Sequence, residues 1–67
     1  MPTIELRAPR GLYRVVGVDT FSSEDWLEGD FKNPKDAVDR ADEKAGQMTK
    51  MHVYNDKGRC IHSAGSF

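Results

Sequence analysis

The chain has 67 residues, of which 37% are hydrophobic and 31% charged, and its formal net charge is −1. This length suits one domain, and a domain of this size buries only about 60% of the surface that its unfolded chain exposes. The balanced charge gives no electrostatic reason to expect a nucleic-acid or membrane ligand, and no apolar run approaches the roughly 20 residues of a membrane span.

Cys60 is the only cysteine, so the chain cannot form an internal disulfide. A single thiol is more typical of the reducing cytoplasm than of a secreted protein, and the first residues lack the apolar core of a signal peptide. We therefore expect a cytoplasmic protein that forms a single domain over residues 1–67. A chain of this size usually needs a metal, a disulfide or a partner subunit as support.

The first half of the chain predicts strands. Alternating residues between two prolines indicate a short edge strand over 3–7, or an arm over 1–10. Leu12–Thr20 is rich in β-branched residues and predicts a strand with Tyr13 and Val15 on one face. Trp26–Lys32 predicts the next strand. Its strict alternation places Leu27 and Phe31 toward the helix, and Trp26 on the opposite face with Glu28 and Asp30.

The middle of the chain predicts one helix, over about residues 34–45. Asn33 is a suitable N-cap, and Pro34 fits the first helical position, where no backbone N–H is needed. An apolar stripe formed by Ala37, Ala41 and Ala45 then follows the helical period, and Gly46 is a natural left-handed stop. The narrow stripe predicts that the helix covers one face of a sheet.

The end of the chain predicts a hairpin around Asn55–Gly58, a type I turn followed by a left-handed glycine. Counting outward places three pairs opposite each other: Tyr54 with Cys60, Val53 with Ile61, and His52 with His62. Val53 and Ile61 then face the helix, and the two histidines face away from it. Protonation of an opposed histidine pair predicts a loss of stability as the pH falls below about 6.5.

Together these elements predict an α+β fold of the type ββαββ. Four strands form an antiparallel-rich sheet in the order 2-1-3-4 or 1-2-3-4, and one helix packs on one face. The other face is left uncovered. On it the expected register gathers the aromatic, histidine and cysteine side chains, which are our candidate interface residues: Tyr13, Trp26, His52, Tyr54, Cys60 and His62.

The number and spacing of the candidate residues argue against a catalytic or metal-binding site on this face. Imidazole and thiolate are zinc ligands, but a structural site needs four, and His52, His62 and Cys60 supply three. Cys60 and His62 are about 7 Å apart along a strand, and no oxyanion donor can be named. We therefore expect no cofactor and no enzyme activity. A small enzyme or metal site built from these residues at an oligomer interface remains an alternative.

A second alternative is a sheet platform for single-stranded nucleic acid. Trp26, Tyr54 and Tyr13 are residue types on which bases stack. Such platforms have a basic surround, whereas Glu28 and Asp30 share the predicted face of Trp26. We therefore expect no binding to nucleic acid above the non-specific level, and none to membranes.

The favoured hypothesis is a small protein-interaction module that associates through the uncovered face, either with a second copy as a homodimer or with an unidentified protein. The size of the chain favours a partner. Trp26 and Tyr54 are residue types that anchor interfaces, and a two-fold axis would use each anchor twice.

Four features also carry a resemblance: the segment YRVV over 13–16, Trp26 at the start of the second strand, the helix with Ala37 and Ala41, and the final segment MHVYNDKGRCIHSAGSF. Over about residues 13–67 the chain resembles a family of small bacterial domains of unknown function with the order strand, strand, helix, strand, strand. The resemblance implies the same fold and assigns no functional residue.

Overall fold

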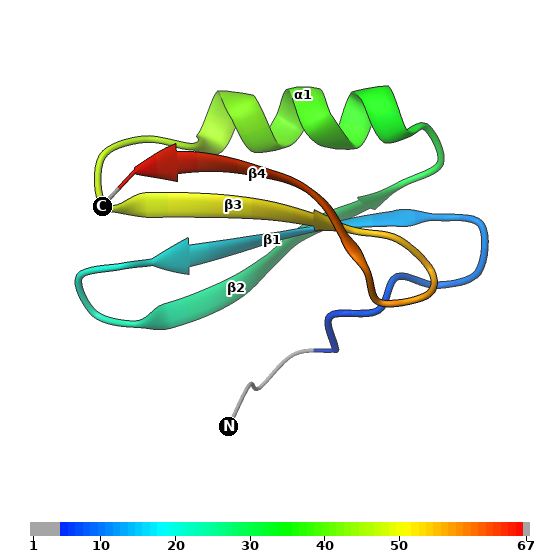
Figure 1. The fold of residues 1–67 in the computed structure, drawn as a ribbon, viewed down its shortest axis with the longest axis horizontal. Coiled ribbons are helices and arrows are strands. Elements are labelled where there is room, and N and C mark those ends of the chain that lie inside the picture. The colour runs from blue at the N-terminus through cyan, green and yellow to red at the C-terminus, as the bar shows by residue number, and fades with distance from the viewer. Residues whose placement is uncertain (1–4, 67) are drawn as a thin grey trace.

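The computed structural model of the protein describes residues 5–66, without the side chain of Ser66. One helix crosses one face of a four-stranded antiparallel sheet (Figure 1). The elements, in chain order, are β1 (Tyr13–Asp19), β2 (Glu24–Phe31), α1 (Pro34–Lys44), β3 (Thr49–Tyr54) and β4 (Cys60–Ser66). The sheet order β2-β1-β3-β4 confirms the ββαββ prediction and selects one of its two strand orders.

The ends of α1 are set by different means. Asn33 Oδ1 accepts a hydrogen bond from Lys35 N at 2.8 Å, which confirms the predicted N-cap. The left-handed stop predicted at Gly46 is wrong, because Ala45 already leaves the helix in an extended conformation. The left-handed residue is instead Met48, with φ of 63°, in the turn that leads directly into β3.

The core lies between α1 and the two central strands. Val15 of β1 and Met51 and Val53 of β3 are fully buried against Ala37 and Ala41 of the helix. The small alanine side chains allow the helix to approach the sheet closely. This core is small, and its rim is formed by larger, partly buried side chains: Tyr13, Trp26, Phe31, Val38 and Ala45.

A β-bulge in β2 corrects the predicted orientation of this strand. Val15 pairs with Gly29 and Val16 with Leu27, so Glu28 is an extra residue without a partner. The extra residue reverses the alternation, and a one-residue shift moves every following side chain to the other face. Phe31 faces the helix as predicted. Trp26 also faces the helix, and Leu27 faces away from it, which is the reverse of the prediction.

A second bulge, in β4, corrects the predicted register of the hairpin. The turn and the pair of Tyr54 with Cys60 are confirmed. One pair further along the strand the register shifts, so Val53 pairs with His62 and His52 with Ser63. His62 therefore lies on the helix side, where its Nε2 is 2.9 Å from Oδ1 of Asp42 in α1. The predicted pairing of the two histidines is wrong, since they lie on opposite faces of the sheet.

The segment before β1 lies on the side of the sheet away from α1 (Figure 1). Ala8 N donates to Asn55 O at 3.1 Å, and the Ala8 side chain is buried. Gly11 N donates to Asp56 Oδ2 at 3.1 Å, so this segment is attached to the β3–β4 turn. Residues 5–7 are not a strand, and the rest of the strand predicted over 3–7 lies outside the described residues.

Candidate functional site

The candidate site is the sheet face away from α1, here called the uncovered face. Strand pairing arranges its residues in three rows that cross the strands in the order β2, β1, β3, β4. The rows are Asp30, Arg14, Tyr54 and Cys60; then Leu27, Val16, His52 and Ser63; then Asp25, Val18, Lys50 and Gly65. The surface is therefore mixed, with charged, aromatic and aliphatic side chains side by side.

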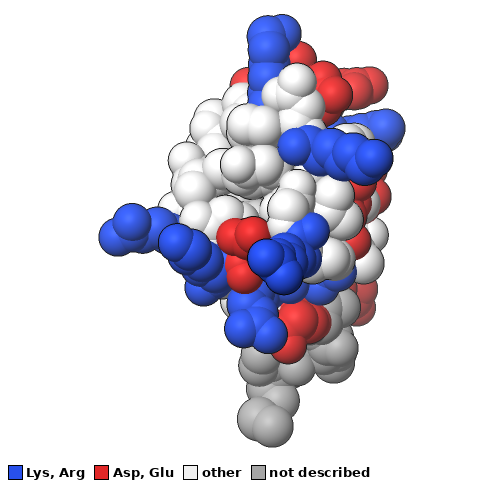
Figure 2. Space-filling model, turned by 90° about the vertical axis from the view of Figure 1, so that its right-hand side faces the viewer, with Lys and Arg blue, Asp and Glu red and all other residues white. Residues whose placement is uncertain are grey.

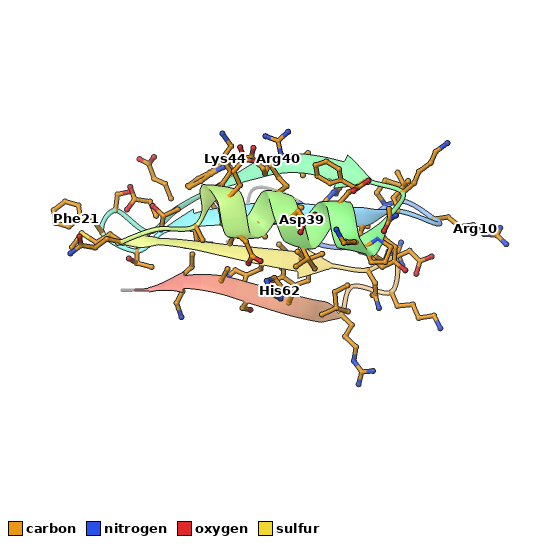
Figure 3. All side chains as sticks on the ribbon, turned by 90° about the horizontal axis from the view of Figure 1, so that it is seen from above. Arg10, Phe21, Asp39, Arg40, Lys44 and His62 are labelled. Carbon is orange, nitrogen blue, oxygen red and sulfur yellow. The ribbon has the colours of Figure 1, made fainter. Side chains whose placement is uncertain are left out.

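The structure brings only half of the predicted interface residues to this face. His52, Tyr54 and Cys60 lie on it, as predicted. Tyr13 and Trp26 pack against the core beneath the helix, and His62 contacts Asp42. Figure 3, which looks down on the helix, shows His62 on β4 beside α1.

Arg14 and Asp30 form an ion pair on the uncovered face. Arg14 Nε is 2.7 Å from Asp30 Oδ1, and Nη2 donates to Asp30 Oδ2 at 3.1 Å, so the pair is bidentate. Arg14 Nη1 also donates to the backbone oxygen of Glu5 at 2.6 Å, which holds the N-terminal segment against this face. The hydrogen bond to Asp30 is the main reason that the pKa of Arg14 is raised above its ordinary value.

A second polar cluster joins β3 to β4. His52 Nδ1 and Ser63 Oγ are 2.9 Å apart, and Ser63 Oγ is 3.5 Å from the Cys60 sulfur. Tyr54 lies beside His52, with ring centroids 6.3 Å apart. Partial burial, and then the charge of Lys50, lowers the pKa of His52. Partial burial also raises the pKa of Tyr54, and the neighbouring Cys60 adds to this effect.

A serine beside a histidine has the composition of a nucleophile and its base, but catalysis needs more than this pair. The reacting group must also find oxyanion donors and a cavity that excludes water. Residues 5–66 form no pocket, and Ser63 and Cys60 lie on an exposed edge strand. The second bulge also divides the predicted metal set, because His62 is on the other face from His52 and Cys60. Within the described residues, no three potential ligands come together.

The structure does not place the three aromatic residues of the predicted nucleic-acid platform on one face. It required Trp26, Tyr13 and Tyr54 on one face, and only Tyr54 lies on the uncovered face. Basic side chains do gather at the end of the molecule where the N-terminal segment meets the β3–β4 turn, with acidic ones between them (Figure 2). Such alternating charge favours neither a polyanion nor a polycation.

The exposed large hydrophobic side chains fall on three surfaces. Leu27, 45% exposed, is on the uncovered face, and Ile61, 43% exposed, is on the edge strand β4. Phe21 and Met48 occupy two adjacent turns at one end of the sheet, joined by the hydrogen bond from Thr20 N to Met48 O at 2.9 Å. Phe21 projects from the end opposite to Arg10 (Figure 3).

Sequence reasoning missed Arg14, Asp30 as its partner, and Ser63. In β1, Arg14 lies between Tyr13 and Val15, and it faces away from the helix because both of these neighbours pack beneath it. The contacts of Arg14 with Asp30 and of His52 with Ser63 depend on the register between strands. The sequence offered one signal of this register, Gly29, since a glycine inside a strand often marks a bulge.

Comparison of the chain with protein-family models, with curated proteins and with solved structures finds no match. Within residues 5–66 no helix has the length and apolar character required to cross a membrane. The function therefore has to be argued from the geometry of the uncovered face itself.

We expect the protein to lose stability as the pH falls from about 7.5 to about 5.5, with His52 as one cause. The predicted repulsion from His62 is not the reason; burial and Lys50 lower the pKa of His52 in the folded state. The stability that this group contributes is thus present above the unfolded value of about 6.5 and is lost as the pH falls toward the folded value. Melting temperatures across this range measure the effect.

The control for this pH dependence is a pair of variants. His52→Gln should show a smaller fall in melting temperature than the parent, and His62→Gln should keep the His52 contribution. An identical pH dependence in the parent and His52→Gln would contradict the assignment to His52.

Proposed function

We propose that this chain is a small non-enzymatic protein-interaction module that associates with a second copy of itself through the uncovered face. The observation that carries the proposal is the two-layer architecture, in which α1 covers one face of the sheet and only the short segment before β1 lies against the other. The surface has no pocket among the described residues, which suits a protein partner better than a small molecule.

The small size of the core supports this proposal, because a chain of this length gains stability from a second subunit. The molecule has extents of 32 × 26 × 15 Å, and α1 is stacked on the sheet along the middle one of these, so the uncovered face spans the longest and the shortest (Figures 1 and 3). A contact over this face alone is therefore at the low end of the sizes of specific protein interfaces.

The chemistry of the face supports the same conclusion. Its middle row contains Leu27 of the edge strand β2, whose side chain is 45% exposed beside the fully buried Val16. Arg14 is held in one orientation by Asp30 and by the Glu5 backbone, so little side-chain entropy remains to be lost on binding. Tyrosine and arginine are among the residue types that carry most binding energy in interfaces. Tyr54 and Arg14 are neighbours on this face.

The test replaces Leu27 by lysine. A lysine within a face-to-face contact would place a charge in a desolvated position, so we expect the variant to be of lower mass than the parent at tens of micromolar protein. Sedimentation equilibrium in reducing buffer measures the masses. Because Leu27 is already 45% exposed, the fold should tolerate the change, and circular dichroism checks this.

The matched control is Phe21→Lys, which makes the same kind of change in the β1–β2 turn, away from the uncovered face. It should keep the mass of the parent. A parent that remains monomeric at hundreds of micromolar would refute self-association, and equal masses for the parent and Leu27→Lys would show that any association uses another surface.

A further inference from the structure

The two edge strands of the sheet differ in how well they are protected from pairing with another strand. An edge strand exposes unpaired backbone N–H and C=O groups, and proteins usually guard such edges with charged side chains or bulges. In β2 both devices are present: the strand contains Glu24, Asp25, Glu28 and Asp30, and the bulge at Glu28 lies in its middle. A second copy of β2 would bring these acids together.

The opposite edge, β4, lacks the charged guard. Its sequence CIHSAGS contains no lysine, arginine, aspartate or glutamate. Within β4 the residues that follow His62 are small, so no long side chain of this strand segment shields its backbone. Among the described residues no strand pairs with the outer side of β4.

We propose that β4 is a docking edge for β4 of a second copy, joined in antiparallel orientation about a two-fold axis. An uncharged strand is complementary to itself in this arrangement, because antiparallel pairing satisfies both backbones and brings no like charges together. This contact is independent of the face-to-face contact proposed above. The two axes are perpendicular, since one is normal to the sheet and the other lies parallel to it.

The geometry of β4 defines the register of this pairing. The bulge at Ile61 and the left-handed Gly65, with φ of 101°, bracket a regular segment formed by His62, Ser63 and Ala64. A two-fold axis at the middle of this segment places Ser63 beside its own copy. It also places Ile61 opposite Gly65 of the second copy, so the largest exposed apolar side chain of β4 meets a residue without a side chain.

The arrangement extends the sheet to eight strands and leaves both copies of α1 on the same face. Asp42 is the helix acid that contacts β4, and its carboxylate is already paired with His62 at 2.9 Å. The second helix therefore approaches without an unpaired carboxylate at this point. On the other side, the two uncovered faces join into one continuous surface.

Cross-linking tests the register directly. In the variant Cys60→Ser with Ser63→Cys, the two new thiols should lie about 4.5–5.5 Å apart at Cα, within the range for a disulfide. Mild oxidation of dilute protein should therefore give a covalent dimer. The matched control, Cys60→Ser with Ala64→Cys, places each thiol opposite His62 of the second copy and should not cross-link above the collision level.

Adding Ile61→Lys to the Ser63→Cys variant should reduce cross-linking to the control level, because a lysine on the edge opposes strand pairing. Adding Leu27→Lys should leave the yield unchanged, which separates this contact from the face-to-face one. Equal yields from the Ser63→Cys and Ala64→Cys variants would overturn the proposal. In the parent, amides of β4 should also exchange with solvent more slowly as the protein concentration rises, and unchanged exchange would likewise overturn it.

Discussion

Replacing Gly17 by alanine is expected to destabilise the fold by about 1–3 kcal/mol, the range for overpacking a well-filled core. A Cβ at this position would collide with Cε2 and Cζ2 of Trp26, whose indole ring lies directly over the glycine. The ring cannot move away freely, because its Nε1 donates to Glu28 Oε1 at 3.2 Å and Glu28 is in turn 3.6 Å from Arg40. Urea denaturation followed by circular dichroism measures the loss.

Gly46→Ala is the matched control, because a Cβ there meets no atom within 4 Å. It should change the stability by much less than Gly17→Ala. A double-mutant cycle then identifies the cause: in a Trp26→Ala background, Gly17→Ala should cost little, because the ring has been removed. An equal cost in both backgrounds would show that the indole ring is not what restricts position 17.

Met51→Ala is expected to have the largest effect of the substitutions considered, a loss of about 2–5 kcal/mol. Met51 is the largest of the fully buried side chains, and it lies in the core cluster against Ala37 and Ala41. Small alanines cannot fill the cavity that its removal would create. A lone core of this size supplies only about 3–5 kcal/mol, so the variant should be largely unfolded at room temperature.

Met48→Ala is the control for this prediction, since Met48 is 45% exposed in the turn before β3. Its left-handed backbone strains methionine and alanine alike, so the change should stay within about 0.5 kcal/mol. Circular dichroism at increasing urea compares the two variants. A cooperative transition for Met51→Ala near that of the parent would contradict the importance of Met51 for the core.

Local signals in the sequence were enough to predict the elements and their order. The N-cap Asn33, followed by Pro34, begins the helix as expected, because both act through the backbone of their immediate neighbours. The turn at Asn55 is confirmed for the same reason: Asn55 Oδ1 accepts from Lys57 N and Arg59 N, each at 2.9 Å, and Gly58 adopts φ of 80°. The prediction that Tyr13 and Val15 share one face of β1 is also confirmed, since that strand has a uniform register with β3, but this face is the one beneath the helix.

The orientation of the edge strands required the tertiary structure. In β2 the bulge at Glu28 exchanges Trp26 and Leu27 between the two faces, and in β4 the bulge at Ile61 sends His62 to the helix side. Half of the candidate interface was misplaced. The two bulges move Trp26 and His62 to the helix side, and Tyr13 lies on the helix side with Val15, the residue with which it was predicted to share a face. Each bulge is one residue that has no partner, and this can be seen only from the neighbouring strand.

The sequence by itself determined the helix, the final turn and the ββαββ order, because these depend on contacts between residues close along the chain. Only the tertiary structure decided which side chains share the uncovered face. A bulge changes little in the local composition, yet it reverses every side chain beyond it. Gly17 and Trp26 illustrate why the face of a side chain depends on tertiary structure. The indole ring of Trp26 can lie on the helix side because its partner on the neighbouring strand, Gly17, has no side chain and leaves space for the ring.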